Sequence, residues 1–166
     1  SDGHRRRQDV YRHHRSLYYG ATGQVGYIDS YLSDGEYVLL GEDGAPFLDP
    51  FAKKAYLIKG KGWVNNHAHV LKSKLNNKFL CYYLNQVDYN GLVTGTTRYK
   101  LTQAAMKQVL VPTPDLVEQE RIVSKIEPLK ELHKRSNLVD RLPIYLLNRI
   151  SLLSWSLRQR TQIQFC

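Results

Sequence analysis

The segment of residues 59–71 gathers side chains that could bind a polyanion and contact polar edges on it. Two lysines, Lys59 and Lys61, alternate with glycines, and a run of amides and imidazoles that includes Asn65 and His67 follows without an acidic residue. Lysine ammonium groups neutralise phosphates, and amide and imidazole groups can donate to and accept from base edges. This combination indicates contact with a nucleic acid.

The lysines are the candidates for phosphate contact. Lys59 and Lys61 are the leading pair, and Lys53, Lys54 and Lys72 are weaker candidates. Ordinary solvent-exposed lysines on a charged face would give the same pattern, and this alternative stays open.

The amides and imidazoles have three readings. If they lie on a strand, alternation places Asn65, His67 and His69 on one face, which could meet nucleic acid or form an internal hydrogen-bond network. His67 and His69 could share a metal ion, but the sequence signals no third ligand nearby. We therefore predict no metal site.

Two further segments present polar side chains. Residues 20–26 lack the Lys-Ser/Thr of a phosphate-binding loop, so we expect a tight turn that presents Thr22 and Gln24. The second, a polar loop, contains Thr97 and Arg98. Arg98 could fork onto a guanine or a phosphate, or form a salt bridge with one of the acids.

Charge is segregated along the chain of 166 residues, whose formal net charge is +9. Residues 28–50 carry six acids and no base, and residues 53–78 carry seven lysines and no acid. Such separation favours a directed surface over a mixed solvated face, and the basic surplus favours an acidic partner.

The chain length suits one domain with one core. No stretch is long and apolar enough to cross a bilayer, and two cysteines make no disulfide framework. We expect no membrane partner and a cytoplasmic protein.

Apolar runs and turn signals predict a mixed α+β fold. We expect a poorly ordered basic arm over residues 1–16 and a folded domain over residues 17–114. The expected strands are residues 37–40, 55–58, 63–64, 68–71 and 109–111, with a Lys-Gly-Lys-Gly turn between the second and the third, and the expected helices are residues 76–84 and 101–106.

A long C-terminal helix is expected over residues 115–142. Asp115 and Glu118 have the spacing of a capping box, and Ile122, Ile126 and Leu129 form a narrow apolar seam. Pro128 should kink or interrupt this helix. The seam should pack on its own domain, on another copy or on a partner subunit. The tail, residues 143–166, is atypical and could be helical.

In their order along the chain, these motifs resemble the DNA-specificity (S) subunits of type I restriction–modification systems. The points of similarity lie between about Tyr18 and Lys134, in residues 20–29, 35–45, 63–71, 95–101 and 112–123. The resemblance implies a target recognition domain, which reads one half of a split site in double-stranded DNA, and a spacer helix. The helix would join methyltransferase subunits and, through them, the restriction subunit.

The resemblance implies a non-catalytic role. S-adenosylmethionine, ATP and Mg²⁺ would belong to the partner subunits, so we expect no cofactor in this chain. Lys59, Lys61, Asn65, His67, Thr22, Gln24, Thr97 and Arg98 would contact DNA. Ile122, Ile126 and Leu129 would contact a partner helix, including that of a second copy in a homodimer.

Two departures from the family pattern accompany the resemblance. Residues 1–16 resemble nothing in the family, and from about Ser136 the chain lacks the polar seam of a spacer helix. We expect either a half-subunit or a truncated, nonfunctional fragment. The alternative from another class is a small metal-dependent nuclease that uses Asp43, Asp49 or the histidines.

Overall fold

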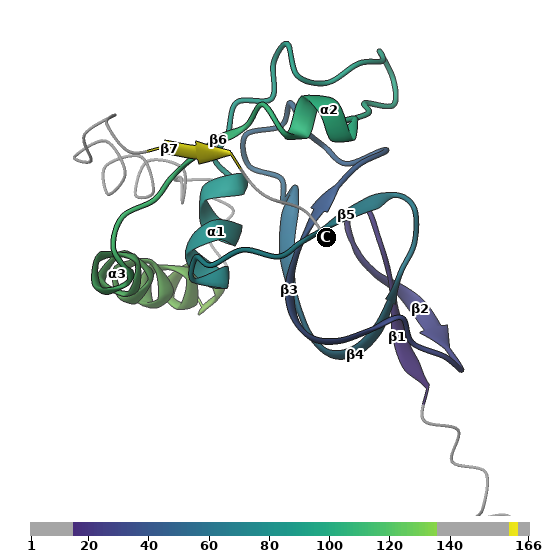
Figure 1. The fold of residues 1–166 in the computed structure, drawn as a ribbon, viewed down its shortest axis with the longest axis horizontal. Helices are drawn as coiled ribbons and strands as arrows, with labels where there is room; N and C mark the ends of the chain where they lie inside the picture. The colour runs from purple at the N-terminus through teal and green to yellow at the C-terminus, as the bar shows by residue number, and fades with distance from the viewer. Residues whose placement is uncertain (1–14, 136–159, 163–166) are drawn as a thin grey trace, which may run out of the picture.

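A mixed five-stranded sheet forms the centre of the structure (Figure 1). The computed structural model describes residues 15–135 and 160–162. Strands β1 (Ser16–Gly20), β2 (Gly23–Ile28), β3 (Ser33–Gly41), β4 (Ala55–Val64) and β5 (Ala68–Leu71) lie in the order β2-β1-β4-β3-β5. Strands β1 and β4 are parallel, and the other neighbours are antiparallel. With the helices described below, the sheet confirms the predicted α+β class.

Strand β4 runs without a break through the segment predicted as a Lys-Gly-Lys-Gly turn, so that prediction is wrong. Gly62 admits a neighbouring group instead of turning the chain. A Cβ on Gly62 would lie 2.9 Å from Cε2 of Tyr19 on β1, which real contacts do not allow. Gly62 also pairs with Leu17 of β1. The small residue therefore lets β1 pack beside β4.

Helix α1 (Asn77–Leu84) packs against β3 and β4. Its Leu80 and Leu84 join Val38 and Leu40 of β3 in the main core, all with 0% exposure. Burial of such aliphatic side chains contributes roughly 1.5–3 kcal/mol each. The sheet and α1 thus form one rigid support for the loops at the sheet's edge.

Short elements follow α1 as predicted. Thr102 caps helix α2 (Gln103–Met106), because its Oγ1 accepts a hydrogen bond from the N–H of Ala105 at 3.2 Å. Strand β6 (Leu110–Pro112) comes next. These elements confirm the predictions for residues 101–106 and 109–111.

Helix α3 (Leu116–Arg135) begins where the capping signal placed it. Oδ1 of Asp115 accepts from the N–H of Glu118 at 2.8 Å. The Glu118 carboxylate also pairs with Arg121, three residues further along the helix. The helix continues through Pro128 to Arg135 without interruption. Residues 136–142 of the predicted helix lie outside the described residues.

The ends of the chain are described only in part. Strand β1 begins at Ser16, the last residue of the predicted arm, and residues 1–14 lie outside the described residues. In the tail, β7 (Arg160–Gln162) pairs antiparallel with β6. A helical tail is therefore wrong for these three residues, and the rest of the tail is outside the description. No helix in the described segments is long and apolar enough to cross a membrane; the cytoplasmic location stays a prediction.

Candidate nucleic-acid interface

A hollow of about 650 Å³ lies where four loops and strand ends meet beside the sheet. The contributing segments are the β1–β2 turn, the start of the β3–β4 connection, the β4–β5 turn and the loop before α2. Its polar lining is Thr22, Asp43, Asn65, His67, Thr97 and Arg98. The fold thereby brings together five of the residues predicted from sequence to contact DNA, and adds Asp43 to them.

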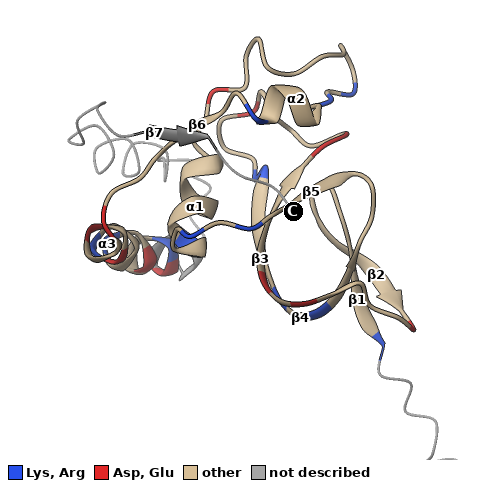
Figure 2. Cartoon of the chain, viewed as in Figure 1, with Lys and Arg blue, Asp and Glu red and all other residues tan. Residues whose placement is uncertain are grey.

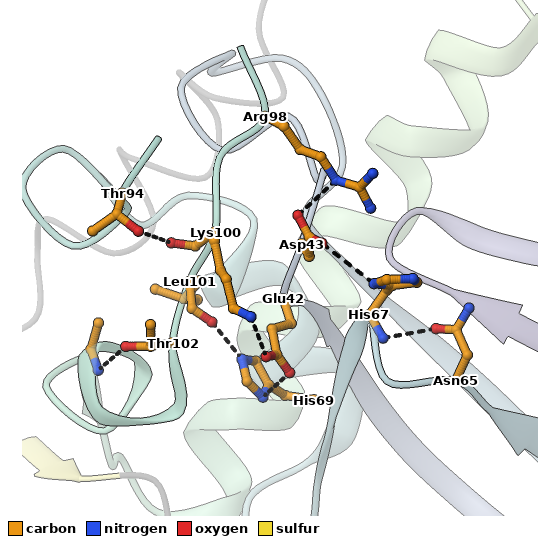
Figure 3. A network of polar contacts seen from close by, with 11 residues as sticks. Glu42, Asp43, Asn65, His67, His69, Thr94, Arg98, Lys100, Leu101 and Thr102 are labelled. Atoms are coloured by element: carbon orange, nitrogen blue, oxygen red, sulfur yellow. Dashed lines mark hydrogen bonds and ion pairs between the residues drawn. The ribbon is translucent and has the colours of Figure 1, made fainter. Parts of the chain in front are cut away.

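Asp43 lies between two cationic or potentially cationic partners in this hollow (Figure 3). Its Oδ1 accepts from Nε of Arg98 at 2.7 Å, and its Oδ2 lies 3.6 Å from Nδ1 of His67. The salt-bridge alternative foreseen for Arg98 is thus the one that the structure contains. The Arg98 side chain is nevertheless 61% exposed, so it remains accessible to a ligand.

A second polar layer lies next to Asp43. His69 is only 9% exposed; its Nε2 lies 2.8 Å from the carbonyl oxygen of Leu101 and its Nδ1 lies 3.5 Å from Glu42. Lys100 Nζ lies 3.6 Å from the other Glu42 oxygen. His69 therefore contacts the segment before α2 inside the protein. Of the alternatives given for it, membership of an internal hydrogen-bond network is the one that the structure contains. Among the described residues, no group of three or more metal-ligating side chains occurs.

Asn65 and His67 lie on a turn, not on a strand. Oδ1 of Asn65 accepts from the N–H of His67 at 2.9 Å, which closes an Asx turn. The N–H of Asn65 donates to the backbone carbonyl oxygen of Tyr19 at 3.0 Å. The strand on which Asn65, His67 and His69 would share one face is therefore absent: the first two line the hollow, and His69 is buried.

The loop that carries Thr97 and Arg98 depends on a glycine. Thr94 and Lys100 exchange backbone hydrogen bonds of 3.0 and 2.8 Å across its base. Gly95 has φ +99°, and a Cβ there would lie 2.3 Å from the Arg98 carbonyl oxygen. Only glycine adopts this conformation without strain, so the position of Arg98 is built into the local sequence.

Comparison with known proteins identifies the family of this chain. The family described as "Type I restriction modification DNA specificity domain" matches residues 8–139. This chain belongs to that family. The match begins within the basic arm, so the expectation that residues 1–16 resemble nothing in the family is wrong from residue 8 onward.

Two relatives of this specificity-domain chain are longer proteins. It is 39% identical over 117 residues to a protein from Haemophilus influenzae whose description is a type I restriction enzyme specificity subunit; the match covers 69% of this chain and 30% of that protein. A type I S subunit structure from M. genitalium aligns with a TM-score of 0.53 at 18% identity, over 70% of this chain and 32% of the other. This second likeness shows a shared fold. The chain spans about a third of the length of either relative.

The leading lysines of this specificity domain lie on β4, away from the lining of the hollow. Lys59 and Lys61 are exposed and pair in register with Glu36 and Asp34 of β3, and Figure 2 shows acidic and basic segments side by side there. Antiparallel partners share a face. The charge blocks that are separate in sequence therefore mix on this hairpin.

The remaining predicted contact residues differ in exposure. Gln24 is exposed on β2, outside the lining of the hollow, and Lys53 and Lys72 are exposed as well. Lys54 is 2% exposed and donates through Nζ to the backbone oxygen of Asp49. Desolvation by burial lowers the pKa of Lys54, and its assignment as a phosphate contact is wrong.

The predicted seam of α3 packs within the chain. Ile122 and Ile126 are 1% and 2% exposed and form a cluster with Phe79 of α1 and Val123. Of the three partners foreseen for the seam, its own domain is the one present. This corrects the assignment of Ile122 and Ile126 to a partner-helix interface, because neither offers exposed surface. Leu129 is half-buried.

The sequence patterns missed one positioning residue, Gln119. It is 2% exposed, and its side-chain amide bonds to the backbone of Asn76 before α1 and of Pro114 before α3. Its only sequence signal is its place between Glu118 and Glu120 after the capping residue, which does not distinguish a buried amide from an exposed one.

Proposed function

We propose that this chain binds double-stranded DNA sequence-specifically through the hollow, as the DNA-recognising part of a type I restriction–modification system. The observation that carries the proposal is the convergence of Thr22, Asn65, His67, Thr97 and Arg98 on one surface from separate segments. Hydroxyl, amide, imidazole and guanidinium groups are the groups that read base edges in the major groove.

The lysine pair on β4 supplies the second part of the proposal. Lys59 and Lys61 are exposed and lie two residues apart on one face of the strand. Their long aliphatic stems would let the ammonium groups reach phosphates beyond the neighbouring acids. Lys61 also lies over the ring of Tyr31, with Nζ 4.6 Å from the centroid. We assign them to phosphate contact that orients the hollow on the duplex.

The wider assembly follows from the family. We propose that the chain directs methyltransferase subunits, and through them a restriction subunit, to one half of a split site. Bond-breaking, S-adenosylmethionine, ATP and Mg²⁺ would belong to those partners. With Ile122 and Ile126 occupied internally, a partner or a second copy in a homodimer would contact other faces of α3. The first turn offers one such face, since Leu116 and Val117 are 58% and 77% exposed.

A duplex-binding titration tests the proposal against the nuclease alternative. The full chain is titrated onto a fluorescent duplex at salt concentrations between 50 and 200 mM, with and without Mg²⁺. Binding should weaken steeply with salt, and the DNA should stay intact. The double variant Lys59→Ala/Lys61→Ala should flatten the log–log salt slope by about one unit for each lost phosphate contact.

Lys125→Ala is the control for each single lysine, because Lys125 is exposed on α3 and its substitution removes one positive charge, half of what the double variant loses. Equal salt slopes for the double variant and the wild type would place the phosphate contacts elsewhere. Cleavage of the duplex by the chain alone in the presence of Mg²⁺ would support the nuclease and contradict the proposed role. Binding that ignores base sequence would point to a nonfunctional fragment.

A further inference from the structure

The ion pair between Asp43 and Arg98 is made through Nε of the guanidinium, and this choice of nitrogen matters for recognition. Asp43 accepts from Nε of Arg98 at 2.7 Å, on the inner edge of the guanidinium. In the part of the chain that the structure describes, Nε makes the hydrogen bond of Arg98, and Nη1 and Nη2 make none. Figure 3 shows both nitrogens on the opposite side of the guanidinium carbon from Nε. The outer edge of the fork is thus free while the inner edge is held.

We propose that Asp43 is a positioning residue that presents this free edge of Arg98 to a guanine in the target site. The inference rests on the proposed DNA-binding function and identifies one base class that the hollow reads. Nη1 and Nη2 would donate to O6 and N7 of guanine, which is the commonest base-specific contact of arginine.

The charge of Asp43 favours a base over a phosphate as the partner of Arg98. The carboxylate lies within hydrogen-bond distance of the guanidinium, so a phosphate on Arg98 would come close to a second negative group. Like charges at such separations repel. The guanine edge carries no net charge and offers two acceptors. Asp43 therefore lowers the affinity of Arg98 for the backbone and leaves its affinity for guanine.

The surroundings hold both residues in place before DNA arrives. The backbone of Asp43 forms an isolated bridge with Lys100, and the Asp43 N–H donates to the carbonyl of His67 at 3.4 Å. At Gly44, where φ is +82°, a Cβ would lie 3.4 Å from Nε of Arg98. The absence of a side chain there leaves space for the guanidinium. Fixing an arginine in advance reduces the entropy lost on binding.

A selection experiment tests Asp43 directly. The full chain is incubated with duplexes that contain a randomised stretch, and the bound fraction is sequenced for the wild type and for Asp43→Ala, Asp43→Asn and Arg98→Lys. Wild-type protein should enrich a motif with a guanine at a defined position. Arg98→Lys and Asp43→Ala should each reduce the preference at that position about tenfold and leave the other positions unchanged.

Asp43→Asn and one further variant, Glu120→Ala, separate positioning from folding and from net charge. Asp43→Asn keeps an oxygen that can accept from Nε, so it should retain more of the guanine preference than Asp43→Ala. Glu120→Ala removes an exposed acid of α3 that does not line the hollow, and its motif should equal that of the wild type. Affinity of Asp43→Ala for unselected duplexes should stay equal or rise, because one negative charge is lost.

The outcomes distinguish this inference from the function on which it rests. If the wild type enriches no motif, the proposed sequence-specific binding is itself wrong. If the wild type enriches a motif that Asp43→Ala leaves unchanged, the function stands and the role of Asp43 is overturned. If Arg98→Lys instead loses affinity for all duplexes alike, Arg98 contacts a phosphate, and the proposed role of Asp43 is again overturned.

Discussion

The side chain of Gln119 and the backbone of Asn76 connect the starts of α3 and α1. Oε1 of Gln119 accepts from the N–H of Asn76 at 2.7 Å, and its Nε2 donates to the carbonyl of Pro114 at 2.7 Å. Asn76 is itself the N-cap of α1, because its Oδ1 accepts from the N–H groups of Lys78 and Phe79. One buried amide therefore fixes where α3 enters the domain.

Replacing this amide should weaken the domain as a whole. Gln119→Ala leaves a part-buried N–H and a buried C=O without their partners, and an unsatisfied buried group costs about 1–3 kcal/mol. The free energy of unfolding in urea measures the loss. Gln108→Ala is the control, since Gln108 is exposed and should change stability by no more than about 0.5 kcal/mol. Equal effects of the two substitutions would show that the bridge contributes nothing.

The apolar seam of α3 should behave as core. Ile126 is 2% exposed against the α1 cluster, so Ile126→Ala should cost about 2–5 kcal/mol. Val117→Ala, at a position that is 77% exposed, should shift the unfolding free energy by about 0.5 kcal/mol or less. A small effect at Ile126 would mean that α3 does not pack on α1 in solution.

Gly41 should tolerate no side chain. A Cβ at this position would lie 2.4 Å from Cβ of Ala45 and 2.9 Å from the carbonyl oxygen of Ala21, and both alanines line the hollow. Gly41→Ala should therefore cost about 1–3 kcal/mol and weaken DNA binding as well. Gly26→Ala meets nothing within 4 Å and should be neutral. A fully stable, binding-competent Gly41→Ala protein would contradict the packing described here.

The contact between the two helices should depend on pH through Glu127. The Tyr82 hydroxyl donates to its carboxylate, and Lys78 Nζ lies 3.4 Å away. The Tyr82 hydrogen bond is the largest cause that lowers the pKa of Glu127, and the lysine adds to it. A lowered carboxyl pKa stabilises the fold above the ordinary value of about 4.3, and this contribution is lost as pH falls through the lower, folded-state value.

Tyr82→Phe should move the titration midpoint of Glu127 up toward the ordinary glutamate value, as measured by carboxyl carbon NMR. The stability difference between variant and wild type should shrink at pH values below that midpoint. An unchanged Glu127 midpoint in Tyr82→Phe would show that the hydroxyl does not donate to it.

Local signals predicted the elements that depend on local chemistry. Asn76, Thr102 and Asp115 begin helices because their side chains accept from nearby backbone N–H groups, and this capping chemistry is visible in sequence. The continuity of β4 was not visible in sequence. Gly62 is required there because the ring of Tyr19, more than forty positions earlier in the chain, occupies the space of a side chain. Partners distant in sequence decide whether a glycine turns the chain or admits a neighbour.

The sequence indicated which types of residue could contact DNA, but it did not indicate which of them lie together in the structure. His67 and His69 are equivalent in sequence, yet Asp43 faces one at the surface and Glu42 faces the other in the interior. Lys54 belongs to the same basic run as Lys59, and only burial distinguishes them. Side-chain exposure depends on the tertiary arrangement of all strands, which periodicity alone does not determine.

The most direct test of the hollow as a DNA reader is a comparison of selected motifs between the wild type and the double variant Thr22→Ala/Thr97→Ala. Both threonines are exposed, so the variant should remain folded. The account predicts that the wild type enriches one short motif and that the variant loses preference at one or more of its positions, with little change in affinity for unselected duplexes. No enriched motif in the wild type, or an identical motif in the variant, would contradict it.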